Sequence, residues 1–330
     1  MNNNYILMKK YYKRKIAVIG SGYWGSIIIN TLYQIGINEI TVYDINRKNL
    51  NIAKKNFKKI KIEKNFKNIL ENNSLKDIFV ATPPSQNYKI VKDLVKNNKN
   101  IFLEKPGFKN LSQLNKINKI FNKKNKFMFG YVYCYNDYIK KIKDIINKKY
   151  LGNILYVSLR RQNLGPIRND VDVNYDLTSH DLSIIIKLFN KAPKIISKKK
   201  YFLLKNDIAD ISTIHLKLNK ISIDINNSWL NPTKERLIKV IGSKKMLIYD
   251  EMNLESPLKI YNQYAKYPKL DFFDKKFFGS KVLIYKGSSE VVKVKVRPPL
   301  QNEILSFLKF KKTYTNINFG KKILSILKRI

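Results

Sequence analysis

The feature that most constrains the fold of this chain is a glycine-rich turn between an apolar run and a segment of helical character. The run KIAVIG (15–20) leads into GSGYWG (20–25), and an amphipathic stretch follows. A G-x-G-x-x-G that follows a strand and opens a helix is typical of dinucleotide-binding domains. Gly20 allows the tight turn, Gly22 lets the backbone approach a pyrophosphate, and Gly25 lets helix and strand pack closely. A glycine turn without a ligand is the alternative.

An acidic residue closes the next predicted strand, EITVYD (39–44). A carboxylate at the position of Asp44 hydrogen-bonds the adenosine ribose of NAD and repels the 2′-phosphate of NADP. Arg47 weakens this preference without reversing it. The helix start after the glycine turn adds N–H groups and a positive dipole, which suit phosphate. We therefore expect NAD as the cofactor, with NADP less favoured.

The order of apolar runs predicts the architecture. Up to about residue 133, short strands alternate with helices of 10–15 residues, which indicates a parallel sheet covered on both faces. Beyond about residue 135, most strand-like runs alternate apolar and polar residues, as in a sheet with one solvated face. The sequence predicts an α/β protein with an NAD-binding Rossmann domain (1–133) and a substrate-binding and oligomerisation domain with a large mixed or antiparallel sheet (134–330). We expect residues 263–280 to form a long loop or arm.

The charge of the chain is strongly positive. The sequence has 65 Lys and Arg against 24 Asp and Glu, a net charge of +41. Such an excess is typical of proteins that bind nucleic acid or anionic membranes. However, 57 of these residues are Lys and 8 are Arg, and the lysines are scattered beside Asn and Ile, as in KNNKN (96–100). We interpret the excess as solvated surface charge, and a polyanion-binding protein is a lower-ranked alternative.

Few residues could hold a metal or form a disulfide. Cys134 is the single cysteine, and His180 and His215 are the two histidines, so we expect no metal site and no disulfide framework. The first residues lack the apolar stretch of a signal peptide, and no apolar run approaches the ~20 residues that span a bilayer. The sequence therefore predicts a cytoplasmic protein with no membrane partner and no specific nucleic-acid partner.

Three further motifs follow predicted strands or open a predicted helix. ATPPSQ (81–86) and Glu104-Lys105-Pro106 both lie at strand ends, and the carboxyl ends of parallel strands point to the ligand crevice in sheets of this type. By itself, EKP is typical of a solvated ion pair. Asp176 and His180 are four residues apart and share one face if the segment is helical. Histidine side chains in general titrate near neutral pH, so a histidine beside a carboxylate suits acid–base chemistry.

With GSGYWG, ATPPS, EKP and DLTSHD in this order and spacing, the chain resembles the Gfo/Idh/MocA family of sugar oxidoreductases. The resemblance implies a Rossmann domain followed by an α/β domain with an open, mainly antiparallel sheet, and a homo-oligomer (dimer or tetramer). It also implies that His180 accepts the hydroxyl proton, that Lys105 stabilises the developing alkoxide, and that Asp176 orients substrate or imidazole. The expected cofactor contacts are Gly20, Gly22, Tyr23, Trp24, Gly25, Asp44, Arg47, Thr82, Pro83 and Glu104.

A narrower resemblance lies in residues 163–186 and 228–251, which are similar to the branch that acts on nucleotide-linked sugars. This branch oxidises the 3-hydroxyl of UDP-N-acetylhexosamines or their uronic acids for surface polysaccharide. Arg160, Arg161 and Arg168 could bind the diphosphate, because guanidinium groups suit phosphate; ordinary surface charge is an equal alternative. A dehydrogenase of a free sugar or inositol is the alternative function. The chain departs from many relatives at Tyr175, at Thr178-Ser179 and at Asn87, which affects substrate shape more than the reaction type.

Overall fold

The computed structural model describes residues 14–266 and 282–330, and the chain divides into two compact units. The first contains the residues up to Asn136 together with Arg297–Arg329, and the second contains Asp137–Val296 with Ile330. This division differs from the predicted domains, because the last helices belong to the first unit. Phe307 of α9 (Pro299–Lys309) explains the difference: its ring packs 5.2 Å from Phe79 and 5.8 Å from Phe102, both on central strands of the first unit.

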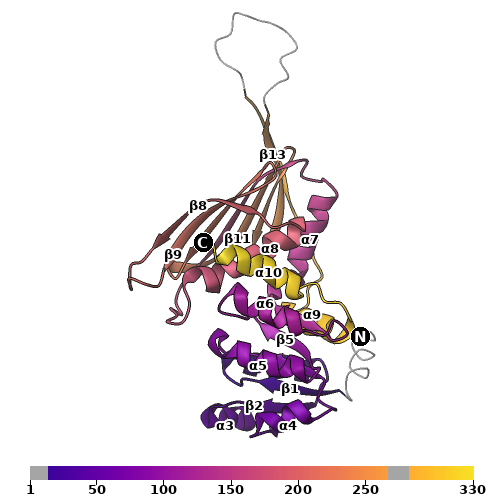
Figure 1. Ribbon diagram of the computed structural model, residues 1–330. Coiled ribbons are helices and arrows are strands. Elements are labelled where there is room, and N and C mark those ends of the chain that lie inside the picture. Colours follow the sequence, from indigo (N-terminus) through magenta and orange to yellow (C-terminus); the bar gives the residue numbers. More distant parts are fainter. Residues whose placement is uncertain (1–13, 267–281) are drawn as a thin grey trace, which may run out of the picture. The chain divides into compact units, whose positions relative to one another are not determined.

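The first unit is built on a six-stranded parallel sheet with the order β3-β2-β1-β4-β5-β6 (Figure 1). Its strands are β1 (Lys15–Ile19), β2 (Glu39–Tyr43), β3 (Lys61–Ile62), β4 (Asp77–Val80), β5 (Asn100–Glu104) and β6 (Phe127–Gly130). Every residue of β4 and β6 is buried, as in a parallel sheet that is covered on both faces. The strand order is that of a Rossmann fold, so the predicted fold of this part is confirmed.

Helices follow the strands of the first unit. They are α2 (Tyr23–Gln34), α3 (Arg47–Asn56), α4 (Phe66–Glu71), α5 (Pro84–Lys96), α6 (Leu111–Ile120), the 3-10 turn η1 (Val132–Tyr135), α9 and α10 (Ile317–Leu327). Two of these elements, β3 and α4, are very short. The buried face of α10 includes Ile323, Leu324 and Leu327.

The second unit is built on an eight-stranded sheet with the order β14-β13-β12-β11-β7-β10-β9-β8. Its strands are β7 (Ile154–Leu164), β8 (Lys194–Tyr201), β9 (Ile211–Leu218), β10 (Ile221–Ser228), β11 (Leu230–Gly242), β12 (Met246–Asp250), β13 (Leu258–Lys266) and β14 (Leu283–Val291). All neighbours are antiparallel except β7 and β10, so the predicted mainly antiparallel sheet is confirmed.

The helices of the second unit lie on one face of its sheet (Figure 1). They are α7 (Asp137–Asn147), the π-helix η2 (Asn174–Thr178) and α8 (Ser179–Phe189). The predicted arm at 263–280 begins inside β13, which extends to Lys266, and its remainder lies outside the described residues. The strand β14 ends at Val291, and residues 292–296 after it are not part of any strand.

Two buried carboxyl groups face each other at the end of β5. Glu104 is 9% exposed, Glu303 of α9 is fully buried, and neither oxygen of Glu303 has a hydrogen-bond partner among the described residues. Burial raises the pKa of Glu104 to about 7, although the charge of Lys105 opposes this shift. Burial and the charge of Glu104 raise the pKa of Glu303 well above its usual range. Two such groups cannot both ionise at low cost, so a proton is retained at neutral pH.

This pair predicts a loss of stability at high pH. Because both pKa values are raised in the folded state, the pair's contribution is complete below about pH 4.5 and is lost as the pH rises through about 7. Glu303→Gln removes one of the two ionisable groups. Between about pH 4.5 and 7, the free energy of unfolding of this variant should therefore fall by about 1–3 kcal/mol less than that of the native chain. Urea denaturation at a series of pH values measures this difference. Glu71→Gln, at a carboxyl group that is 60% exposed, is the control, and an equal pH dependence in Glu303→Gln and the native chain would contradict the prediction.

Candidate functional site

The glycine turn after β1 contains two glycines that packing requires and one that it does not. Gly20 has a φ of +88°, and a Cβ on it would lie 2.8 Å from the Ala81 carbonyl oxygen. A Cβ on Gly25 would lie 1.9 Å from the Gly20 carbonyl oxygen. In contrast, apart from its two chain neighbours, no described residue has an atom within 4 Å of a Cβ built on Gly22. The absence of a side chain at Gly22 is therefore not explained by the protein itself, but it suits close approach by a ligand.

The start of α2 is suited to an anion. No described side chain caps this helix, whose first turn begins after Gly22. Four other helices of the first unit, α3, α4, α6 and α10, are capped by asparagine side chains. The N–H groups and positive dipole of an uncapped helix start favour a phosphate group.

Asp44 lies at the end of β2 and is tied to the glycine turn. Its Oδ2 accepts hydrogen bonds from the Ser21 backbone N–H at 2.7 Å and from the Ser21 hydroxyl at 3.1 Å. Its Oδ1 accepts the N–H of Asn46, which caps α3. Arg47 is exposed at the start of α3, and Tyr23 is 79% exposed beside the turn. The structure therefore brings together the predicted carboxylate and the glycine turn.

The ends of β4 and β5 are joined by a buried asparagine. The Thr82 hydroxyl donates to Asn87 Oδ1 at 2.5 Å, and Asn87 Nδ2 donates to the Gly107 carbonyl oxygen at 2.5 Å. Asn87 thus links the ATPPS loop to the turn that follows Lys105, and Lys105 itself is half-buried. The predicted cofactor contact Glu104 instead turns inward, where its two carboxyl oxygens would lie 2.9 and 3.0 Å from a Cβ on Gly130. Pro83 is exposed at the start of α5.

In the second unit, Asp176 lies in the π-helix η2. The Ser179 N–H donates to the Asn174 carbonyl oxygen, five residues back, which is the π-helical pattern and not the α-helical spacing we expected. Single-turn π-helices are frequent at functional sites. The Asp176 carboxylate accepts the indole N–H of the fully buried Trp229 at 3.2 Å and lies 3.8 Å from Arg168 Nη1. Asp176 is therefore held in place by Trp229, which the sequence analysis did not single out.

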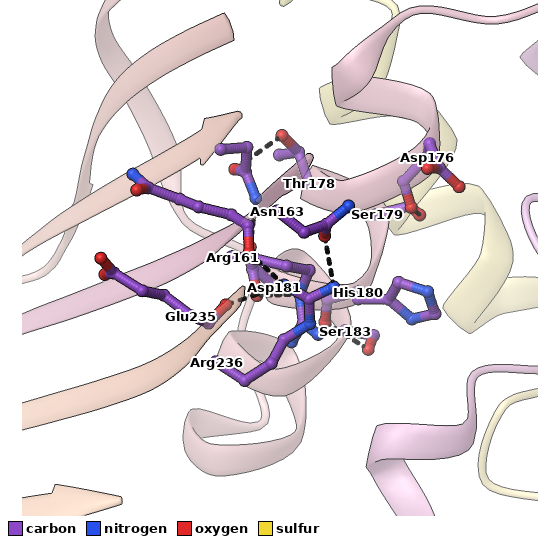
Figure 2. Close-up of polar contacts among 12 residues, drawn as sticks. Arg161, Asn163, Asp176, Thr178, Ser179, His180, Asp181, Ser183, Glu235 and Arg236 are labelled. Atoms are coloured by element: carbon purple, nitrogen blue, oxygen red, sulfur yellow. Dashed lines mark hydrogen bonds and ion pairs between the residues drawn. The ribbon is translucent and has the colours of Figure 1, made fainter. Parts of the chain in front are cut away.

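His180 is half-buried in the first turn of α8, directly after η2. Figure 2 shows its imidazole turned away from Arg161, whereas the neighbouring Asp181 is turned toward it. The His180 carbonyl oxygen accepts the Ser183 hydroxyl at 2.6 Å. Asp176 and His180 therefore lie on successive helical turns of the second unit, and Lys105 belongs to the first.

The three predicted phosphate-binding arginines have different environments. Arg160 is exposed, with Glu235 at 3.8 Å. Arg161 is the next residue of the same strand and therefore faces the other side of the sheet, where it is buried against Asp181 at 3.0 Å. Arg168 makes a bidentate ion pair with the exposed carboxylate of Asp170 at 2.7 and 2.9 Å. The arginines therefore do not form one cationic cluster. The guanidinium of Arg161 is paired with a buried carboxylate and does not face solvent.

The described residues contain neither a metal-binding cluster nor a membrane-spanning helix. No group of three or more His, Cys, Asp or Glu side chains is placed to hold a metal ion. Within the described ranges, no helix is both long enough and apolar enough to span a bilayer.

The fold and the glycine turn define a Rossmann domain of the dinucleotide-binding type, followed by an α/β unit. Comparison of the chain with known proteins agrees with this assignment. Residues 14–131 match the Gfo/Idh/MocA model of the oxidoreductase family with an NAD-binding Rossmann fold. No curated protein matches the chain.

Several solved structures share the whole fold at low identity. UDP-N-acetylglucosamine 3-dehydrogenase GnnA from Acidithiobacillus ferrooxidans has a TM-score of 0.76 and 17% identity, over 96% of each chain. A protein described as a myo-inositol dehydrogenase from Sinorhizobium meliloti has a TM-score of 0.75 and 16% identity, over 96% of this chain and 95% of that one. A protein described as an NADPH-dependent oxidoreductase from Desulfitobacterium hafniense has a TM-score of 0.78 and 13% identity, over 95% and 93%.

The contrast between the glycines gives a direct test of the turn. Gly22→Ala places a methyl group in open space, so we expect an unchanged melting temperature and a dissociation constant for NAD raised about tenfold or more. Gly25→Ala overpacks the strand–helix contact and should lower stability by about 1–3 kcal/mol. Thermal unfolding and quenching of intrinsic fluorescence by NAD measure both quantities. Native affinity for NAD in Gly22→Ala would contradict a role for this turn in binding.

Proposed function

We propose that the chain is an NAD-dependent oxidoreductase of the Gfo/Idh/MocA family that oxidises a hydroxyl group of a sugar. The observation that carries the proposal is the turn at Gly22. There, packing leaves open space beside a helix start that no described side chain caps, and Asp44 follows the next strand. The match of residues 14–131 to the family supports it independently. The intact Lys105, Asp176 and His180 favour turnover over a regulatory role.

The proposed chemistry divides among three side chains. NAD, when bound, supplies the hydride acceptor. His180 takes the hydroxyl proton, because an imidazole can accept a proton near neutral pH. The Lys105 ammonium stabilises the negative charge that develops on the same oxygen. Asp176, held by Trp229, orients the substrate or the imidazole.

Asp44 supports NAD over NADP as the cofactor. Its carboxylate accepts hydrogen bonds from Ser21 of the glycine turn, so a negative charge is fixed beside the turn, and this charge would repel a 2′-phosphate. Asp44→Asn keeps an acceptor for Ser21 but removes the charge. We expect this variant to lose about tenfold in its preference for NAD over NADP, measured as the ratio of the two dissociation constants. An unchanged ratio would exclude Asp44 as the selecting group.

For the substrate, we propose the 3-hydroxyl of a UDP-linked sugar, in a route to surface polysaccharide. Arg160 and Arg168 are the arginines with exposed surface that support a diphosphate contact, and the likeness to UDP-N-acetylglucosamine 3-dehydrogenase supports the fold alone. A free sugar or inositol is the alternative, since a protein described as an inositol dehydrogenase has the same fold. The homo-oligomer and the cytoplasmic location stay predictions.

The catalytic roles are tested by two alanine variants. Lys105→Ala and His180→Ala should each lower kcat by at least about 10²-fold with UDP-N-acetylglucosamine or its uronic acid, because each removes a charge or proton acceptor needed in the transition state. NADH absorbance measures turnover, and NAD binding should persist in both. His215→Ala is the control, because this other histidine lies on β9 and pairs with Asp224. Full activity in both variants would exclude the proposed roles, and activity on free sugars alone would favour the alternative substrate.

A further inference from the structure

We infer that Arg161, Asp181 and Asn227 form a buried polar clamp that sets the rotation of α8 and thereby aims His180. This inference rests on the proposed function of His180. Arg161 thus becomes a positioning residue in place of the substrate contact expected from the sequence.

The clamp joins two neighbouring strands to one helix. Arg161 of β7 is in register with Asn227 of β10, so their side chains lie next to each other on the covered face of the sheet. Both donate to Asp181: Arg161 Nε to Oδ1 at 3.0 Å, and Asn227 Nδ2 to Oδ2 at 2.8 Å. All three side chains are at least 96% buried, at 4%, 0% and 1% exposure for Arg161, Asn227 and Asp181.

The clamp continues into the π-helix. The Thr178 hydroxyl lies 3.1 Å from Asn227 Oδ1 and 3.0 Å from Asn174 Oδ1, and both Thr178 and Asn174 are buried. The same group of side chains therefore fixes the turn before His180 and the residue after it. Figure 2 shows this part of the site, with Arg161 and Asp181 on the sheet side of the helix.

The surroundings of α8 explain why such a clamp is needed. The helix is buried on most of its surface, with Leu182, Ile184, Ile185, Ile186 and Leu188 all inaccessible or nearly so. Apolar contacts on all sides are non-directional and specify rotation and depth poorly. A desolvated ion pair adds little net stability, but buried polar groups can specify register. Because Asp181 is adjacent to His180, a small rotation of α8 changes the direction of the imidazole.

The decisive experiment compares the single variant Arg161→Met with the double variant Arg161→Met/Asp181→Leu. The single variant leaves a buried carboxylate without its cation, so both melting temperature and kcat should fall. The double variant removes that charge, so it should regain melting temperature, while kcat stays about tenfold to 100-fold below the native value and KM for NAD is unchanged. Recovery of kcat together with stability would show a merely structural pair and overturn the inference.

A second variant and a second readout keep the test independent of turnover. Asp181→Asn keeps the shape and an acceptor for Asn227 but loses the charge. The chain has two histidines, so imidazole NMR resonances are assigned with His215→Gln. In Asp181→Asn the His180 resonance and titration midpoint should shift while those of His215 do not, and Arg161→Lys should retain part of kcat. An unmoved His180 resonance would overturn the clamp. A native protein without dehydrogenase activity would overturn the proposed function, and the NMR result would still test the clamp.

Discussion

The edge of the parallel sheet where β1 ends and α2 begins depends on the close backbone contact between Gly20 and Gly25. A methyl group at Gly25 would lie 1.9 Å from the Gly20 carbonyl oxygen, so α2 can begin directly against the end of β1 only because that position has no side chain. At the same turn, no described side chain caps the start of α2, and the Ser21 N–H donates to Asp44. One contact therefore sets three properties of this edge: a helix start that suits an anion, open space at Gly22, and a fixed carboxylate beside them.

The second unit uses buried polar groups in a comparable way. On the covered face, β7 presents Val157 and Leu159 before Arg161, and β10 presents Ile223 and Ile225 before Asn227. The apolar rows supply most of the burial energy, whereas the polar pair at their end supplies direction. Asp181 is the acceptor for both, so the position of the helix start that carries His180 is defined where the apolar core ends.

The parallel sheet could be predicted from the sequence because β1, β4 and β5 are nearly continuous apolar runs bounded by glycine or proline. The position of the motifs at the carboxyl ends of these strands could be predicted in the same step. In ILYVSLRR, the alternation of a strand puts Arg160 and Arg161 on opposite faces of the sheet. In NNSW, the same alternation puts Asn227 on the covered face. Applying the strand period to these polar residues would therefore have predicted that the two arginines have different environments. The π-helix could not be predicted. Asp176 and His180 are four residues apart in the sequence, and this separation fits an ordinary α-helix, so nothing in it indicates a π-helical turn. Glu303 could not be paired with Glu104 from sequence, because the two are joined only by packing of α9.

The composition gives a physical reason to single out the few arginines. The chain has 57 Lys and 8 Arg, and several of the arginines act as forked, planar donors. Arg161 bonds a buried carboxylate, Arg168 binds Asp170 through two nitrogens, and Arg236 donates to the Gln162 carbonyl oxygen and to Asn163 Oδ1. A lysine ammonium supplies charge at a solvated surface equally well, but it cannot reproduce this geometry. The excess of lysine therefore carries little information about function, whereas Arg161 and Arg168 contact Asp181 and Asp176, on either side of His180 in the sequence.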